Sequence, residues 1–357
     1  MNRKPRFAAG LLLGMWFTAA AAAQTYKITD LGTISGFSSS VAFDNNNKGQ
    51  ITGCSDNSIL PTIPCYTNIP ADASLWSKSK GLQDLGHLSG DDSSVAYVVN
   101  DSGMVVGSSA NTTSGAVHGF VWTQSGGMVG LASLPGCDCY TFATAITSKG
   151  VIAGESAVSN GDEDVVLWTK SGGTYQIHDE KHLPNAPYVY ANDINENLQV
   201  TGVAYFFNNN SKYRAFLWSK VAGWRDLHAL AGGNSKGEWI NNLGVVAGLS
   251  TSTKYPNGVS VYWDATGIHP ISTLPGGSSS WAGYISDTKQ ITGESTVAGG
   301  ATHAYLWTQK KGMQDLNNMI PKNSGWVLRH AAAINKAGQI VGYGEIKGVE
   351  HGFLLTP

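Results

Sequence analysis

The sequence predicts an all-β protein, a single seven-bladed β-propeller with four antiparallel strands in each blade. Two observations carry this prediction. A glycine that ends a short apolar run returns at intervals of 45 to 54 residues along nearly the whole chain. Each interval holds four short runs of β-forming residues bounded by Gly, Asn, Asp or Ser, and a repeat of this length with four strands is typical of a propeller blade.

Four markers define the repeat. The marker glycines are Gly53, Gly107, Gly154, Gly202, Gly248, Gly293 and Gly342. Seven positions earlier stands a short polar residue suited to starting a turn: Asn46, Asn100, Thr147, Asn195, Asn241, Ser286 and Asn335. Four positions before that stands a tiny residue: Ala42, Ala96, Ala143, Ala191, Gly237, Ala282 and Ala331. The run after the glycine ends in Trp76, Trp122, Trp168, Trp218, Trp263 and Trp307, with Leu355 in the seventh unit.

The markers have physical reasons in a propeller. Blades converge on a central axis, so the innermost strand of each blade is crowded, and Ala or Gly suits that position. A tryptophan carries a large apolar area that can fill the space between neighbouring blades. We therefore expect the repeated tryptophans to belong to the core and not to bind a ligand.

The order of the strands within a blade predicts how the ring closes. The tryptophan run is joined to the next Leu-rich run by a short turn, which indicates a hairpin inside one blade. Residues 26–31 then form an outer strand without partners, and residues 352–356 end a blade that lacks its outer strand. We expect these two segments to pair, because pairing removes both open sheet edges.

Residues 1–23 have the pattern of a secretory signal peptide, and residues 24–357 are assigned to the propeller. The positive start contains Arg3, Lys4 and Arg6, residues 7–20 are apolar, and three alanines precede the expected cleavage point. The mature chain is therefore expected to be secreted or periplasmic. The next residue is Gln24 and not Cys, so no lipid or other membrane anchor is expected.

The charge balance gives no reason to expect a polyanionic partner. The whole chain has 23 basic and 25 acidic residues, and removal of the first 23 residues leaves 20 basic residues against 25 acidic ones. A mildly acidic protein is not expected to bind nucleic acid or an anionic membrane. No P-loop, dinucleotide fingerprint, HExxH motif or nucleophile elbow is present, and no cofactor is expected.

Four cysteines in an exported chain favour disulfides, and four cysteines allow three connectivities. Cys54 and Cys65 flank one variable loop and are the first choice for a pair. The partners of Cys137 and Cys139 stay open. A metal site around Asp138, between these two cysteines, is the weaker alternative, because no second Cys or His pair stands nearby; no metal is expected.

The repeat resembles the HAF family of extracellular bacterial repeats. The tripeptide for which that family is named is matched by His118-Gly119-Phe120, Arg214-Ala215-Phe216, His303-Ala304-Tyr305 and His351-Gly352-Phe353. The companion motifs are Asp-Leu-Gly, at 30–32 and 84–86, and the segment 334–342. The third and fifth units depart from the tripeptide, at 164–166 and 259–261. The resemblance covers essentially the whole mature chain and implies an exported propeller-like protein, but no particular activity.

The lengths of the connections predict a working face. The turn after the tiny-residue run and the turn after the tryptophan run are short and nearly constant. The connection after the glycine run and the crossing to the next blade, such as 178–189, vary in length. In an up-and-down blade the two variable sets emerge at the same end of the ring, and function usually resides on such loops.

The crossing loops, expected nearest the axis, supply the candidate ligand-binding side chains. These are Asp91, Asp92, Asp138, Tyr140, His178, Asp179, Glu180, His182, Tyr188, Lys236, Trp281 and Trp326. For the acidic and histidine-rich segment 178–182 the simpler interpretation is a solvated loop, and for Asp91 and Asp92 it is an ordinary turn. Carboxylates, histidines and aromatic rings together suit a sugar chain, whose rings stack on aromatic faces and whose hydroxyls bind polar groups.

Two functions follow from this pattern. The first is a non-catalytic exported binding or surface protein, with a polysaccharide or another surface protein as partner, because the repeat is regular and carries no catalytic motif. The alternative is an exported carbohydrate-active enzyme, a polysaccharide hydrolase or lyase, because the same loops offer groups for acid–base chemistry. Catalytic residues are not identified by the sequence.

Overall fold

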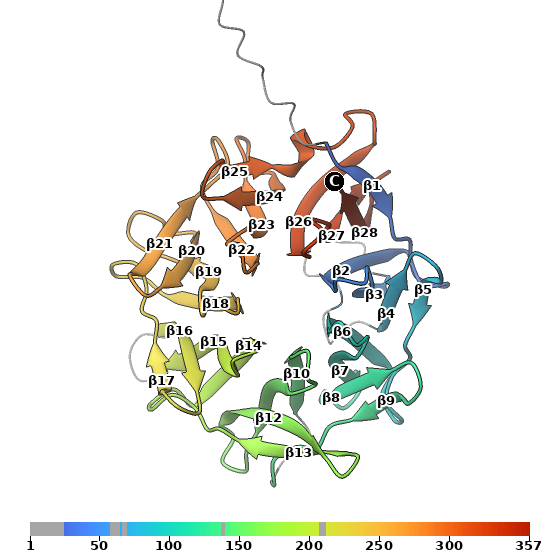
Figure 1. Cartoon of the computed structure of the whole chain (residues 1–357), viewed down its shortest axis with the longest axis vertical. Helices are drawn as coiled ribbons and strands as arrows, with labels where there is room; N and C mark the ends of the chain where they lie inside the picture. Colours follow the sequence, from blue (N-terminus) through green and yellow to red (C-terminus); the bar gives the residue numbers. More distant parts are fainter. Residues whose placement is uncertain (1–24, 58–64, 66–69, 137–139, 207–211) are drawn as a thin grey trace, which may run out of the picture.

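The computed structural model describes residues 25–57, 65, 70–136, 140–206 and 212–357. These residues form seven four-stranded antiparallel sheets arranged as a ring around a central axis (Figure 1). The predicted seven-bladed propeller is confirmed. Within these ranges no helix has the length and apolarity of a membrane span. The signal peptide predicted for residues 1–23 lies outside the described residues.

The strands fall into four classes by their place in a blade. The innermost strands are β2 (Ser39–Asn45), β6 (Ser93–Val99), β10 (Thr141–Ile146), β14 (Tyr188–Ile194), β18 (Ser235–Ile240), β22 (Ser280–Ile285) and β26 (Trp326–Ile334). The second strands, which contain the marker glycines, are β3 (Ile51–Asp56), β7 (Val105–Asn111), β11 (Ile152–Ala157), β15 (Gln199–Phe206), β19 (Val246–Ser250), β23 (Ile291–Thr296) and β27 (Ile340–Ile346).

The other two classes complete each sheet. The third strands are β4 (Ala71–Ser77), β8 (Ala116–Thr123), β12 (Glu163–Ser171), β16 (Lys212–Ser219), β20 (Val259–Asp264), β24 (Thr302–Thr308) and β28 (Val349–Thr356). The outer strands are β5 (Gly81–Asp84), β9 (Gly127–Gly130), β13 (Thr174–Asp179), β17 (Gly223–Asp226), β21 (Gly267–Ser272), β25 (Gly312–Asp315) and, in the last blade, β1 (Lys27–Asp30). Blades are numbered 1 to 7 in the order of their innermost strands.

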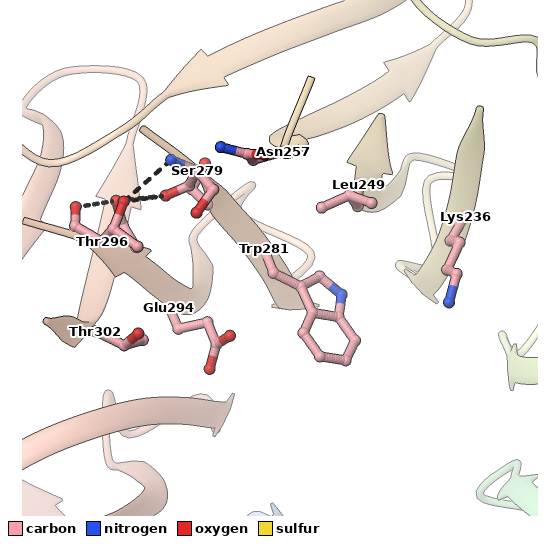
Figure 2. A pocket seen from close by; sticks show the side chains of 10 residues that line it. Lys236, Leu249, Asn257, Ser279, Trp281, Glu294, Thr296 and Thr302 are labelled. Carbon is pink, nitrogen blue, oxygen red and sulfur yellow. Dashed lines mark hydrogen bonds between the residues drawn. The ribbon is translucent and has the colours of Figure 1, made fainter. Parts of the chain in front are cut away.

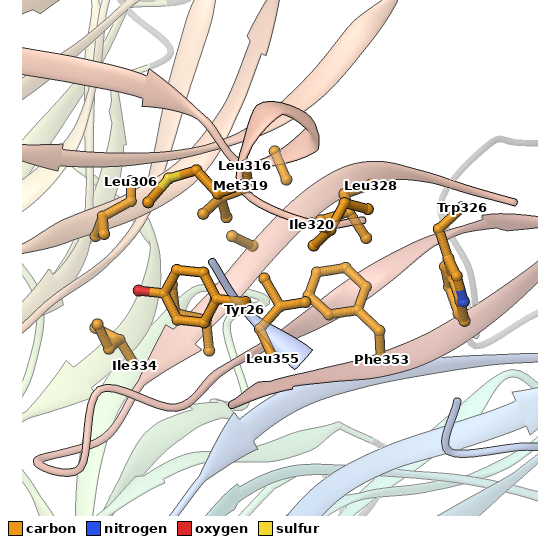
Figure 3. Packing of buried hydrophobic residues seen from close by; sticks show 13 residues of the cluster. Tyr26, Leu306, Leu316, Met319, Ile320, Trp326, Leu328, Ile334, Phe353 and Leu355 are labelled. Atoms are coloured by element: carbon orange, nitrogen blue, oxygen red, sulfur yellow. The ribbon is translucent and has the colours of Figure 1, made fainter. Parts of the chain in front are cut away.

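Blade 7 joins the two ends of the chain, as predicted. β1 pairs antiparallel with β28, with Lys27 opposite Thr356 and Asp30 opposite Phe353. Tyr26, just before β1, inserts into the buried cluster of this blade beside Leu355 and Met319 (Figure 3), and its backbone N–H donates to the carbonyl of Met319. The closed ring therefore gives β1 a partner and pairs β28 on both sides, and β1 becomes the outer edge of blade 7.

The marker glycines are explained by a bulge in the neighbouring strand. In all seven blades the register between the innermost and second strands shifts by one residue just after the tiny residue. The bulge turns the carbonyl of the residue before the tiny one toward the marker glycine. A Cβ at any of these glycines would overlap that oxygen, for example Tyr190 O at Gly202. The position therefore excludes every side chain.

Neighbouring blades are joined by a recurring hydrogen bond at the tiny residue. A backbone N–H in the third strand donates to a Ser or Thr hydroxyl that stands two positions before the tiny residue of the next blade. The bonds are Ala73 N to Ser94, Gly119 N to Thr141, Ala215 N to Ser235, Ser260 N to Ser280, and Gly352 N to Ser40. Small residues on both sides permit this close approach, since Gly119 already lies against Ala143.

The repeated tryptophans belong to the core, as expected. Trp122, Trp168, Trp218 and Trp263 are buried, and Trp76 and Trp307 are half-buried against the apolar clusters between blades. The predicted Cys54–Cys65 disulfide is also present; it ties the end of β3 to the following loop. Cys137 and Cys139 lie outside the described residues.

Candidate functional site

The two ends of the ring differ in what their side chains do. The turns between innermost and second strands lie at one end, here called the short-turn face; the connections after the second strands and the crossings between blades lie at the other, here called the variable-loop face. On the short-turn face the marker asparagines bind the next blade: Asn46 donates to Asn100 O, Asn100 to Thr147 O, Asn195 to Asn241 O, Asn241 to Ser286 O, and Asn335 to Asn46 O. These asparagine side chains thus join neighbouring blades.

The variable-loop face carries a pocket of about 250 Å³ between blades 5 and 6. Its lining comes from β18, β19, the loop before β20, β22, β23 and β24: Lys236, Leu249, Asn257, Ser279, Ser280, Trp281, Glu294, Ser295, Thr296 and Thr302. In Figure 2 the indole of Trp281 projects between Glu294 and Lys236, with Ser279 and Thr296 above it. The pocket therefore combines one aromatic ring with hydroxyl, amide and charged groups.

Trp281 is held in place from behind and left open in front. On β22 it stands between the buried residues Ser280 and Ala282, so its side chain lies on the opposite side of the strand from theirs. The Trp281 residue is 40% exposed. Its ring meets the edge of the His330 imidazole at 6.1 Å between centroids. His330 in turn stacks on Tyr343 at 5.1 Å. The indole is thus backed by two further rings of blade 7 and presents a face to solvent.

The ionisable groups around Trp281 have two different environments. His330 Nδ1 lies 3.0 Å from Glu294 Oε2, so the Glu294 carboxyl on the pocket wall has a partner. Glu238, one residue after the tiny residue of blade 5, hydrogen-bonds the Trp281 side chain, and burial raises its pKa to about 7. Its Oε2 also accepts from Asn192 Nδ2 at 3.2 Å. One carboxyl beside the pocket therefore binds its proton much more tightly than an ordinary glutamate.

Two of the predicted ligand-binding residues, Lys236 and Trp281, line this pocket. Tyr188 lies on the same face in blade 4, where it opposes Tyr205 across β14 and β15. Tyr140 lies in blade 3 with its ring 5.0 Å from that of Phe142, and burial raises its pKa, with the nearby Glu155 and Glu163 adding to the shift. Asp138 lies outside the described residues.

Asp91 and Asp92 hold loops together in blade 2. The buried Asp91 carboxylate lies 3.1 Å from Nδ1 of His118. The Asp92 carboxylate accepts hydrogen bonds from Thr112, through the backbone N–H and the hydroxyl, and these bonds lower its pKa. Both carboxylates are occupied by their own blade, in line with the simpler interpretation of an ordinary turn.

The predicted loop 178–189 begins later than expected. His178 and Asp179 are the last residues of β13, the outer strand, and therefore lie at the rim of the ring and not near the axis. His178 Nε2 meets the Thr169 hydroxyl at 2.7 Å, and His182 Nδ1 lies 2.6 Å from Asp164. Asp179 pairs with Lys181, and Glu180 accepts from the Trp224 indole through its backbone carbonyl. This segment interacts with its own blade and its neighbour and does not line the pocket.

The position predicted for Trp326 is also wrong. It was expected as a rim aromatic, but it is 9% exposed and packs edge-on against Phe353 at 6.1 Å in the blade 7 core (Figure 3). The reason is the length of β26, whose nine residues include a second register shift between Leu328 and His330. The strand therefore begins well before the level at which the other innermost strands begin.

The sequence missed most of the pocket wall. Glu294 and Thr296 end a second strand, and Thr302 begins a third strand, so none stands in a crossing loop. The only available signal was position, because each lies at the variable-loop end of its strand. In the described ranges, no three His, Cys, Asp or Glu side chains are grouped so as to hold a metal ion.

No protein-family model matches this sequence, and no curated protein matches it. Several solved structures are similar to the fold. An oligogalacturonate lyase from Vibrio parahaemolyticus is 9% identical, with 93% of each chain covered and a TM-score of 0.57. The propeller domain of the Trilobed protease from Pyrococcus furiosus is 8% identical, covering 90% of this chain and 94% of that one, with a TM-score of 0.55.

A virginiamycin B lyase from Staphylococcus aureus is 11% identical, covering 93% of this chain and 99% of that one, with a TM-score of 0.52. At such low identities the likeness concerns the propeller fold alone. Propellers with this architecture therefore include enzymes, and any function of this chain has to be argued from its own site.

Proposed function

We propose that this chain is an exported propeller of the HAF-repeat type that binds carbohydrate in the pocket between blades 5 and 6. The observation that carries the proposal is Trp281. Of the tryptophans in the described ranges it is the one with an exposed side chain, and its ring faces a pocket lined by hydroxyls, an amide and charged groups. An aromatic face stacks on the C–H face of a sugar ring while polar neighbours fix the hydroxyls.

The exposure of Trp281 has no evident role in folding. The repeated tryptophans fill the spaces between blades, whereas this ring gives up part of the burial that stabilises a protein. The ring packs against His330, which itself stacks on Tyr343, and it hydrogen-bonds Glu238, so its motion is restricted. A ring that is both exposed and held loses little conformational entropy when a ligand binds, which favours affinity.

Export is supported by the Cys54–Cys65 disulfide, since disulfides persist mainly in oxidising compartments. The pattern of residues 1–23 and the tripeptides that resemble the HAF repeat agree with this assignment. The variable-loop face would then meet polysaccharides outside the cell or in the periplasm.

The test is a glycan-binding screen of the mature protein, followed by titration calorimetry of each glycan that binds. Trp281→Ala should lower affinity about tenfold or more, equivalent to about 1.4 kcal/mol, while the protein stays folded, which circular dichroism checks. Trp281→Phe should retain part of the affinity, because a smaller aromatic face remains. A screen without any bound glycan, or equal affinity of Trp281→Ala and the parent, would contradict the proposal.

A second candidate, a carbohydrate-active hydrolase or lyase, is favoured by one observation. Glu238 hydrogen-bonds the Trp281 side chain and has a pKa raised by burial to about 7, and Glu294 lines the pocket on the other side of the indole. Acid–base catalysis uses such a pair. The screen should therefore include assays for new reducing ends and for unsaturated sugars. Product formation that Glu238→Gln abolishes would select the enzyme over the binding protein.

A further inference from the structure

We propose that the ligand of this pocket is an extended, predominantly uncharged sugar chain, which runs from Trp281 past Lys236 onto a row of tyrosines in blade 4. The tyrosine row is Tyr188, Tyr190, Tyr205 and Tyr213. The inference rests on the proposed carbohydrate function and goes further, because it specifies a ligand of several units and a second contact surface in another blade.

The tyrosine row lies on one side of the blade 4 sheet. Tyr205 opposes Tyr188 on one neighbouring strand and Tyr213 on the other, so these three residues share a level and a face. Tyr190 stands two residues after Tyr188 and therefore points to the same side. The rings are in contact: centroids are 5.5 Å apart for Tyr190 and Tyr205 and 5.6 Å apart for Tyr205 and Tyr213.

The row lies at the same end of the ring as the pocket. Tyr188 begins β14, Tyr205 stands next to the end of β15, and Tyr213 stands next to the start of β16. All three strand ends face the variable loops. The four tyrosines are half-buried, so each ring has one part packed and another accessible.

Lys236 connects the row to the pocket. Its Nζ lies 5.5 Å from the centroid of the Tyr213 ring, and the same side chain forms part of the pocket wall beside Trp281. Lys236 therefore lies between the tyrosine row of blade 4 and the pocket that contains Trp281. Amphipathic side chains of this kind cover apolar ligand faces while their polar tips stay hydrated.

The size of the pocket favours a ligand that continues beyond it. A volume of about 250 Å³ lies below the roughly 300–1,000 Å³ of pockets that enclose a whole drug-sized ligand. A short sugar unit fills such a pocket, and the rest of a chain must lie on the surface outside it. The row beside Lys236 is a surface of suitable chemistry.

The charges around the track favour an uncharged chain. Lys236 and Glu294 lie on opposite walls of the pocket, so the one cation of the pocket faces a carboxyl group. A polyanion would gain one cation and meet at least one carboxylate. Like charges at such distances oppose binding, so we expect neutral chains to be preferred over uronic acid chains.

The experiment measures affinity against chain length. Cello-oligosaccharides and malto-oligosaccharides from the disaccharide to the heptasaccharide are titrated into the mature protein, with oligogalacturonides as charged counterparts. For the neutral series that binds, affinity should rise about tenfold or more with length and then level off. Tyr213→Ala should abolish the rise and leave the shortest binding oligomer unaffected, whereas Trp281→Ala should weaken every length.

The matched control is Tyr175→Ala. Tyr175 is also a half-buried tyrosine beneath a lysine, with Lys170 Nζ 5.9 Å from its ring, but it lies on β13 in blade 3. It should leave all affinities unchanged. If Tyr213→Ala does not fold, Tyr213→Leu keeps apolar packing without the aromatic face and serves in its place.

The outcomes separate this inference from the proposed function. Equal affinity at all lengths, or an equal loss at all lengths in the Tyr213 variant, would overturn the extended site while leaving carbohydrate binding in place. A preference for oligogalacturonides would overturn the uncharged ligand. The absence of binding to every series and to the wider glycan screen would overturn the proposed function itself.

Discussion

Each marker glycine lies against a carbonyl oxygen of the neighbouring strand, because a bulge in that strand turns the oxygen toward the glycine. A methyl group at this position would overlap the oxygen. Gly202→Ala places a Cβ onto the Tyr190 carbonyl oxygen. We expect a loss of about 1–3 kcal/mol in the free energy of unfolding, as for other overpacked interiors. Urea denaturation followed by tryptophan fluorescence measures it.

The control is Gly130→Ala, at the end of β9, where a Cβ would meet only the flexible end of Leu88 at 3.4 Å. Its midpoint should stay close to that of the parent. If both variants lost equal stability, the effect would come from removing glycine as such and not from the carbonyl contact.

Some functional residues could be predicted from the sequence because the repeat itself places them. Lys236 and Trp281 stand directly before the tiny residues Gly237 and Ala282, so their alignment put them at the variable-loop end near the axis. Glu294 and Thr302 could not be found in this way. They belong to strands whose alignment gives no sign of an opening, since the pocket exists only where blades 5 and 6 meet.

At the scale of the strands and turns, hydrogen bonds on the short-turn face join each of several blades to the next one. The Asn241 side chain accepts from Leu243 N and Val245 N within its own turn and donates to Ser286 O of the next blade. Asn241→Ser keeps an acceptor for the turn and loses the donor to blade 6. Ser286 O keeps its hydrogen bond from Lys289 N, so we expect a loss of about 0.5–1.5 kcal/mol, the net contribution of one hydrogen bond.

Thr147→Ser is the matched control for this turn. Thr147 stands at the same position in blade 3 and accepts from Val151 N through its hydroxyl, a bond that serine can also make. Thermal unfolding of both variants should show a clear decrease for Asn241→Ser and almost none for Thr147→Ser. Equal decreases would mean that the bond between blades contributes nothing measurable.

Strand lengths explain where the sequence-based placement failed. The repeat predicts the number and order of strands, but not that β13 has six residues where β5 has four, which carries His178 and Asp179 into the outer strand. β26 likewise extends to Trp326 and buries it. The length and register of a strand depend on contacts between segments that are distant in sequence. A short polar run such as 178–182 has no periodicity from which the end of the strand could be predicted.

At the scale of the whole molecule, buried carboxyls make stability depend on pH. Burial raises the pKa of Asp44 to about 6 and the pKa of Glu163, Glu238 and Glu350 to about 7. The folded state therefore holds more protons than the unfolded chain between the ordinary carboxyl pKa and about 7, so the unfolding free energy decreases as pH rises through this window. The melting temperature should be higher at pH 5 than at pH 8.

Glu238→Gln provides the comparison for this pH effect, since an amide cannot ionise. Its melting temperature should decrease less between pH 5 and pH 8 than that of the parent. A parent protein that becomes more stable over this range would contradict the assignment of these carboxyls as buried and protonated.

Closure of the ring predicts the effect of removing the end of the chain. Deletion of residues 351–357 takes away the residues that β1 pairs with and two side chains of the blade 7 core, Phe353 and Leu355. We expect a large loss of stability, because an apolar cluster is opened and two strand edges become unpaired. Limited proteolysis should then cut near residues 26–31, which the intact ring protects. An unchanged melting temperature would show that closure contributes little.

The same closure sets the order in which this molecule can fold. Blades 1 to 6 are built from hairpins that are local in sequence, whereas blade 7 requires contacts such as that of His351 with Asp30, which are 321 positions apart. Contacts of such high sequence separation form slowly. We therefore expect the docking of one four-residue strand, β1, to be the final event of folding. Until it docks, the open ring exposes the edge of β28 and the apolar cluster around it, and this is the species most prone to aggregate during biogenesis.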